Sequence, residues 1–210
     1  IGVRLVGSEM CIRDRPVVAS AALAKRMERL GADAVVAEGC EAGGHIGELT
    51  TMALTPSVCD AVSIPVITAG GVADGRGLVA AFALGGEGVQ VGTRFLTAFE
   101  CGIHDAYKQK VIGAKDSDTI VTGRPSGHPV RQLKNRFARD VRKMEGDSDA
   151  SVDEIEQMLA GSLHRAVTGD VEMGSLMSGQ VACLVHDEKP AAQIVDDLMN
   201  EAYTLSLIHI

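Results

Sequence analysis

The stretch that decides the fold is "IPVITAGGVADGRGLVAAFALGGEGVQVGTRF", residues 64–95. It begins with a short apolar, β-branched run at 64–70, which is typical of a buried strand. A segment rich in alanine and leucine follows at 75–86 and predicts a helix. A second apolar run at 88–95 predicts another strand. Strand, helix and strand in this order indicate two parallel strands whose connecting helix covers their sheet.

The same alternation occupies the residues before this stretch. Strands are predicted over 16–20 and 33–38, with a helix over 21–31 that stops at Gly31. Residues 49–63 predict a helical turn followed by a helix. Four strands separated by helices predict an α/β fold with a parallel sheet. The regular repeat favours half of a TIM (β/α)8 barrel over a doubly wound sheet, although a whole barrel needs eight strands.

The pattern changes after about residue 125. Helical periodicity replaces the alternation, and three helical stretches are expected over 128–146, 149–170 and 189–203. The first has an apolar stripe with arginines on its other faces. The second starts with Ser151 as a plausible N-cap and Glu154 three residues later, which is a capping box. This part of the chain is therefore predicted to be an α-helical region.

Both ends of the chain depart from these patterns. Residues 1–15 have no clear period and meet a good strand abruptly, and residues 204–210 follow what reads as a finished helix. Both resemble read-through of sequencing-adaptor sequence, so we expect them to be foreign segments. A genuine N-terminal strand and a genuine C-terminal tail are the alternative.

Composition excludes several function classes. Hydrophobic residues make up 46% of the 210, enough for a sizeable core, but aromatic residues are only 3% and tryptophan is absent. That argues against a stacking platform for single-stranded nucleic acid, and a net charge of −8 argues against binding nucleic acid or an anionic membrane surface. Five cysteines without a CxxC pair indicate free thiols and a cytoplasmic protein. No apolar run reaches the length of a membrane span.

Two glycine-rich loops follow the last two predicted strands. In "AGGVADG" (69–75) the N–H groups of Gly70 and Gly71 would be exposed at a strand end, next to the positive end of a helix. In "GVQVGTRF", Gly92 and Thr93 would add another N–H and a hydroxyl. Ordinary tight turns between strand and helix would also contain glycines. Two such loops one repeat apart favour a phosphate site.

A third loop, "GCEAGGHIG" (39–47), places His45 among four glycines. An imidazole titrates near neutral pH and suits proton transfer, whereas a lone histidine more often caps a helix. Glu38 at the end of the preceding strand could accept hydrogen bonds from a cofactor ring, or could be a solvated loop charge. A metal site is poorly supported, because the other histidines are scattered and no paired cysteines accompany them.

These residues carry a family resemblance. The set EAGGHxG, AGGxADG and GVQxGTRF over residues 16–203 resembles the flavin-dependent enoyl-acyl-carrier-protein reductase II and nitronate monooxygenase superfamily. The stretches "DTIVTGRPSGHPVR" (118–131) and "GSLMSGQVACLV" (174–185) extend the match and lean toward the reductase. The motifs are specific for the superfamily and separate its two activities less well.

The resemblance implies a TIM barrel that holds FMN non-covalently. Gly70, Gly71, Gly92 and Thr93 would hold the phosphate, with a contribution from Ala69. Glu38, Gly43, Gly44 and His45 would lie beside the flavin ring. His45 would be the acid or base, protonating the carbon next to the thioester carbonyl or stabilising its enolate. The flavin would carry the redox chemistry.

The leading expectation is an NAD(P)H-dependent, FMN-containing enoyl-thioester reductase of fatty-acid synthesis. Its partner would be the acidic acyl carrier protein, docking on the basic face of 128–146, and a homodimer is among the assemblies we expect. Nitronate monooxygenase, which needs oxygen and no nicotinamide, is the first alternative. A non-catalytic phosphate-binding module is the second. A phosphosugar-type barrel enzyme fits less well, because no lysine or carboxylate pair accompanies the loop with His45.

The chain departs from the family in one respect, because the first half of the barrel has no counterpart here. The expected organisation is a foreign segment at 1–15, a half-barrel FMN-binding region at 16–125, a helical region at 126–203 and a foreign tail at 204–210. A half barrel leaves two unpaired strand edges and an open core. We therefore expect this chain alone to bind FMN poorly and to aggregate.

Overall fold

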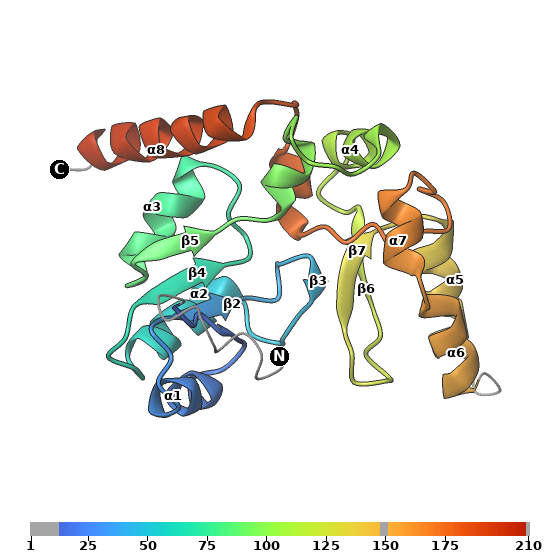
Figure 1. The fold of residues 1–210 in the computed structure, drawn as a ribbon, viewed down its shortest axis with the longest axis horizontal. Helices are drawn as coiled ribbons and strands as arrows, with labels where there is room; N and C mark the ends of the chain where they lie inside the picture. The colour runs from blue at the N-terminus through green and yellow to red at the C-terminus, as the bar shows by residue number, and fades with distance from the viewer. Residues whose placement is uncertain (1–12, 148–150, 209–210) are drawn as a thin grey trace, which may run out of the picture.

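The structure is a computed structural model that describes residues 13–147 and 151–208 (Figure 1). Its centre is a four-stranded sheet in the order β1-β2-β4-β5, in which every neighbouring pair is parallel. The strands are β1 (Val17–Val18), β2 (Val35–Glu38), β4 (Val66–Ala69) and β5 (Gly88–Gln90). This confirms the parallel α/β sheet that the sequence predicts.

Helices pack on one face of this sheet. They are α1 (Ala21–Arg29), α2 (Thr51–Cys59) and α3 (Gly75–Ala83). Val35 and Ala37 of β2 join Leu54 and Val58 of α2 in one buried cluster. Because side chains alternate along a strand, Val36 and Glu38 point to the opposite face. Glu38 is therefore directed away from the helices at the carboxyl end of its strand.

The strand predicted over 88–95 is shorter than the sequence suggests. Strand β5 ends at Gln90, and the chain then forms the 3₁₀ helix η2 (Thr93–Thr97). The guanidinium of Arg94 is buried inside this turn and donates to the Thr97 hydroxyl, the Asp187 carbonyl and the Asp187 carboxylate. These bonds hold the turn across the end of the sheet. Helix α4 (Asp105–Ile112) follows.

A second, antiparallel sheet has the order β3-β7-β6. Its strands are β3 (Gly44–His45), β6 (Thr119–Thr122) and β7 (Val130–Leu133). The prediction of one helix over 128–146 is therefore wrong for its first third. Pairing with β6 and β3 makes residues 130–133 a strand. Helix α5 (Arg136–Glu145) begins only after Asn135, whose side chain accepts from Ala138 N.

The remaining helices are α6 (Val152–Leu159), α7 (Ser162–Val167), η3 (Gln180–Leu184) and α8 (Ala191–Ile208). The capping box of Ser151 and Glu154 is confirmed. Gly161, at a φ of 69°, separates the stretch predicted over 149–170 into two helices. Helix α8 continues through 204–208, so the expectation of a helix finished by 203 is wrong. Most of the segment 1–15 lies outside the described residues.

Helix α8 lies along α3, on the far side of that helix from β2 (Figure 1). Ile194, Leu198 and Ala202 of α8 share a buried cluster with Leu78 of α3. The antiparallel sheet and helices α5 to α7 form the opposite end of the molecule (Figure 1). The loops after β2, β4 and β5 lie between these two ends. None of the helices in the described ranges is long and apolar enough to cross a membrane.

Candidate functional site: a glycine-lined cavity at the carboxyl ends of the parallel strands

Strand register determines where the site forms. Glu38 pairs with Ala69, and Ala69 pairs with Gln90, so the last residues of β2, β4 and β5 form one row across the sheet. Because the strands are parallel, the three loops that follow start from the same edge. The glycine-rich segments that the sequence singles out are these three loops. Their proximity is thus a consequence of the strand order.

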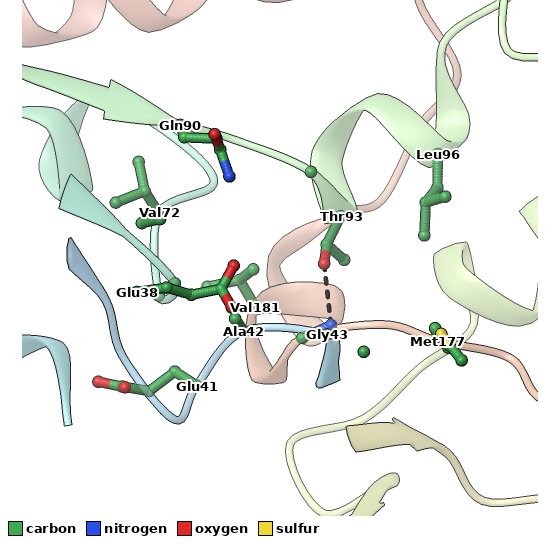
Figure 2. Close-up of a pocket in the computed structure, with 16 residues that line it drawn as sticks. Glu38, Glu41, Ala42, Gly43, Val72, Gln90, Thr93, Leu96, Met177 and Val181 are labelled. Atoms are coloured by element: carbon green, nitrogen blue, oxygen red, sulfur yellow. Dashed lines mark hydrogen bonds between the residues drawn. The ribbon is translucent and has the colours of Figure 1, made fainter. Parts of the chain in front are cut away.

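The three loops surround a cavity of about 260 Å³ (Figure 2). All eight residues predicted to bind the cofactor line it: Glu38, Gly43, Gly44, Ala69, Gly70, Gly71, Gly92 and Thr93. The structure thus brings together residues from positions 38 to 93, while their role in binding stays a prediction. A cavity of this size is slightly smaller than the roughly 300–1,000 Å³ of typical ligand pockets. A flavin would therefore extend beyond it.

His45 does not line this cavity. It is an exposed residue of β3, directly after the lining residue Gly44, and it pairs with Val130 of β7. The structure therefore places the imidazole near the cavity, on a strand held by the antiparallel sheet. From that position the His45 imidazole could act on a molecule bound over the cavity. The imidazole itself stays exposed to solvent.

The loop after β4 requires glycine at two adjacent positions. Gly70 and Gly71 have φ values of 85° and 77°, which other residues rarely adopt. A Cβ on Gly70 would also lie 2.8 Å from the carbonyl oxygen of Gly39, so two loop backbones touch there. Within the described ranges, no protein acceptor is bonded to the N–H groups of Gly70, Gly71 or Gly92. These free donors fit the predicted anion cradle.

The start of helix α3 does not contribute to this cradle as the sequence suggests. Asp74 accepts from the N–H groups of Arg76 and Gly77, and Glu201 of α8 accepts from Gly75 N at 2.8 Å. Two carboxylates therefore occupy the first N–H groups of the helix. These N–H groups are therefore not open to a phosphate, and a contribution of the helix dipole stays a prediction.

A further wall of the cavity comes from a loop in the second half of the chain. Met177, Gly179 and Val181 line the cavity, and Gly179 N donates to the Thr93 hydroxyl at 2.9 Å (Figure 2). A Cβ on Gly43 would lie 2.6 Å from the Ser178 carbonyl carbon, which shows how closely the two segments pack. The hydroxyl of Thr93 thus serves as an acceptor within the protein and keeps its own proton for a ligand.

Sequence reasoning did not find this wall as part of the site. The segment 174–185 extends the family resemblance, and nothing in its spacing connects it with Thr93, 86 residues before Gly179. It also did not find Gln90, which lines the cavity two strands from Glu38. Alternation along β5 could have located Gln90, because its side chain must point to the same face as the cavity.

The side chain of Glu38 reaches into the cavity (Figure 2). It is half-buried, and within the described ranges no donor is bonded to its carboxylate. Burial raises the pKa of Glu38 above its ordinary value, because the charged form loses water without gaining a partner. An unpaired carboxylate in this position is suited to accept hydrogen bonds from a bound molecule.

The fold and the cavity define the class of protein. A parallel sheet covered by helices, with a glycine-lined cavity at the carboxyl ends of its strands, is the arrangement found in (β/α)8 barrels. In those barrels the phosphate sites lie in the loops after the last two strands, which correspond here to β4 and β5.

Comparison with known proteins identifies the family. The sequence profile described as nitronate monooxygenase matches residues 7–201, so the chain belongs to that family, whose members are flavin-dependent oxidoreductases. A probable nitronate monooxygenase of Staphylococcus aureus (strain MSSA476) is 39% identical over 83% of this chain and 52% of its own length. The chain thus spans about half the length of the curated relatives it matches.

Two solved structures are similar to this chain. FabK from Thermotoga maritima is 49% identical, with a TM-score of 0.91 over 99% of this chain and 66% of its own. A nitroalkane oxidase from Streptomyces ansochromogenes is 29% identical, with a TM-score of 0.78 over 92% of this chain and 58% of its own. Both likenesses confirm the TIM-barrel-like α/β fold.

Proposed function

We propose that this protein is an FMN-dependent reductase of the enoyl double bond in acyl-carrier-protein thioesters, with NADH or NADPH as the hydride source. The observation that carries the proposal is the comparison with FabK, an enoyl-acyl-carrier-protein reductase II. Its 49% identity extends over 99% of this chain, beyond the half barrel and through the C-terminal region. The nitronate monooxygenase relative reaches 39% over 83% of the chain.

The residues around the cavity fit an FMN. The free N–H groups of Gly70, Gly71 and Gly92, with the Thr93 hydroxyl, suit a phosphate. Glu38 and Gln90 offer acceptors and donors on the face where a ring would lie. When bound, the flavin would supply hydride transfer from the nicotinamide to the enoyl thioester.

The part assigned to the chain's own side chains is proton handling and positioning. His45, exposed beside the cavity, would give a proton to the carbon next to the thioester carbonyl, or hold the enolate by a hydrogen bond. Gly43 and Gly44 let the loop lie against a flat ring, because neither carries a side chain. Met177 and Val181 would cover the other side of the cavity and exclude water.

Nitronate monooxygenase is the second candidate, and the family profile and the S. aureus relatives favour it. Paired assays on one flavin-loaded preparation separate the two. The reductase is expected to oxidise NADH or NADPH when crotonyl-acyl carrier protein is added, with a saturated product and no oxygen uptake. A monooxygenase would consume oxygen with an alkyl nitronate and would ignore the thioester. Oxygen uptake with the nitronate, without nicotinamide oxidation in the presence of the thioester, would show that the protein is a nitronate monooxygenase.

The docking surface for acyl carrier protein is narrower than the sequence suggests. Arg131 is a strand residue with only 8% of its surface exposed, so it is removed from the proposed surface. Arg139 and Lys143 on helix α5 are exposed. Reversing both charges should raise KM for crotonyl-acyl carrier protein several-fold and leave KM for crotonyl-coenzyme A unchanged. An unchanged KM for the carrier-protein substrate would refute this surface.

A further inference from the structure

The loop with His45 is rich in glycine, so ordering it has a large entropic cost that contacts with the rest of the chain must offset. Residues 39–47 contain four glycines, each of which loses more backbone entropy on ordering than any other residue type. Its regular pairing is short, because strand β3 contributes only Gly44 and His45, opposite Arg131 and Val130. Single backbone bonds add to this pairing, from Ile46 N to the Pro129 carbonyl and from Gln180 N to the Glu41 carbonyl.

Arg131 contacts this loop at two separate points. Its backbone pairs with Gly44 near the end of the loop. Its side chain folds back, and Nε donates to the carbonyl oxygen of Cys40, near the start, at 3.0 Å. The Nη1 group donates to the Thr119 hydroxyl on β6 at 3.1 Å. One residue thus joins both ends of the loop and ties them to the antiparallel sheet.

Burying the guanidinium of Arg131 at this position is energetically unfavourable. Arg131 is 8% exposed, and within the described ranges no carboxylate forms an ion pair with it. Burial lowers the pKa of Arg131, while the neighbouring Cys40 and Glu41 act in the opposite direction. An apolar residue would avoid the cost of burying this charge, but it could not bond a carbonyl and a hydroxyl at once. The two hydrogen bonds that the Arg131 guanidinium donates therefore explain why a charged side chain is buried here.

The same loop is anchored in the opposite direction by Glu41. The Glu41 carboxylate points away from the cavity (Figure 2), and both of its oxygens accept from the backbone N–H of Thr51, at 3.0 and 2.9 Å. Cys40 and Glu41 are therefore fixed toward opposite sides of the loop, by Arg131 and by helix α2. Ala42, Gly43 and Gly44 follow this fixed point and form the wall of the cavity.

We propose that Arg131 is a positioning residue of the site, which closes the loop 39–47 and holds His45 at the edge of the cavity. This role rests on the proposed function insofar as His45 is the acid. The mechanical part, fixing the loop, is independent of any substrate. The two parts can therefore be tested separately.

The mechanical part is tested by hydrogen exchange of the full chain. Arg131→Met removes both side-chain bonds, and Arg131→Lys keeps the charge but cannot reproduce the two-point contact. Because Arg131→Met removes two hydrogen bonds donated by a charged group, amides in peptides covering 39–47 should exchange at least about tenfold faster in this variant. Arg131→Lys should be intermediate. Arg139→Lys, at an exposed position, is the matched control and should leave these peptides unchanged.

Thr119→Val covers the case in which Arg131→Met does not fold. It removes one acceptor of the guanidinium and leaves the arginine in place. Faster exchange confined to 39–47 and to β6 supports the proposal. Exchange in 39–47 that stays at the parental rate, or that rises equally across all peptides, overturns it.

The functional part is tested on the flavin-loaded chain. Moving His45 should lower kcat about tenfold in Arg131→Met while KM for the nicotinamide stays within about twofold, because proton transfer depends on geometry more steeply than binding does. Arg131→Lys should recover part of kcat. An unchanged kcat overturns the positioning role. If the parental chain shows no nicotinamide-driven reduction, the proposed function fails, and the exchange comparison still decides whether Arg131 fixes the loop.

Discussion

Three glycines assigned the same task should respond very differently to alanine. Gly70, Gly71 and Gly92 all line the cavity and are all predicted to donate to a phosphate. Their backbone conformations and surroundings differ, so the three alanine substitutions should change the free energy of unfolding by different amounts. Each of them adds one methyl group next to the predicted phosphate site. Comparing the free energy of unfolding with flavin affinity in the three variants therefore separates fold from binding.

Gly70→Ala should be the most destabilising. A residue with a Cβ at a φ of 85° costs about 1–2 kcal/mol, and the new atom would lie 2.8 Å from the Gly39 carbonyl oxygen. Relieving such a contact by backbone movement costs typically another 1–3 kcal/mol. The expected loss is about 2–5 kcal/mol, or a Tm lower by about 4–20 °C for a chain of this size.

Gly71→Ala meets the conformational cost alone, because its Cβ would have only ordinary contacts, 3.7 Å from Glu41 Cβ. We expect a loss of about 1–2 kcal/mol. Gly92→Ala meets neither cost, since its φ is −110° and nothing lies within 4 Å of the added Cβ. It should be neutral or stabilising by about 0.4–1 kcal/mol, because alanine restricts the unfolded chain.

Thermal melts and flavin fluorescence-quenching titrations of the three variants provide the assay. The decisive variant is Gly92→Ala, which should keep the parental Tm and bind FMN at least about tenfold more weakly, because its methyl group enters the space assigned to the phosphate. If Gly92→Ala binds FMN as the parent does, the cradle is placed wrongly. If all three variants lower Tm equally, the reasoning from φ and contacts is refuted.

Three further predictions concern single side chains. His45→Ala should abolish turnover and keep FMN affinity, whereas His128→Ala, exposed in the β6–β7 hairpin, should change neither; turnover that survives in His45→Ala would point to a non-catalytic module. Glu38 has a raised pKa, so the folded state binds its proton more tightly, and stability falls as pH rises from the ordinary value of 4.5 through the raised value. Glu38→Gln should therefore be more stable than the parent at pH 7 and equal to it below about pH 4 in urea melts; a difference that is constant with pH would contradict the assignment. Thr51→Val should lose about 1 kcal/mol, because the Thr51 hydroxyl bonds the Gly70 carbonyl at 2.9 Å, and Thr51→Ser should lose less; equal melts for the two would show that this bond contributes nothing.

Local sequence patterns predicted the parallel sheet well. Runs such as 33–38 and 64–70 are bounded by helix formers and glycines, and their burial on the helix-facing side agrees with the structure. The eight lining residues could be found for the same reason, because in a parallel sheet the loops after neighbouring strands must meet at one edge.

The misjudged elements depend on distant partners. Val130 and Leu133 are three residues apart and continue the apolar period of helix α5, so the sequence alone extends that helix backward. Pairing with β6, from residues 119–122, makes this segment a strand. The bond between Gly179 and Thr93 likewise connects residues far apart in the chain, and no local spacing encodes it. Glu201 at the start of α3 is a third case.

The decisive measurement is an anaerobic titration of the purified chain by NADH and then by NADPH, with FMN added in excess because the half barrel is expected to bind it poorly. The visible absorbance of the bound flavin reports its reduction, with free FMN at the same concentration as the control. We expect rapid bleaching by one of the two nicotinamides, followed by return of the colour when crotonyl-acyl carrier protein is added. Bound flavin that stays oxidised with both nicotinamides, in a chain that consumes oxygen with an alkyl nitronate, would contradict it.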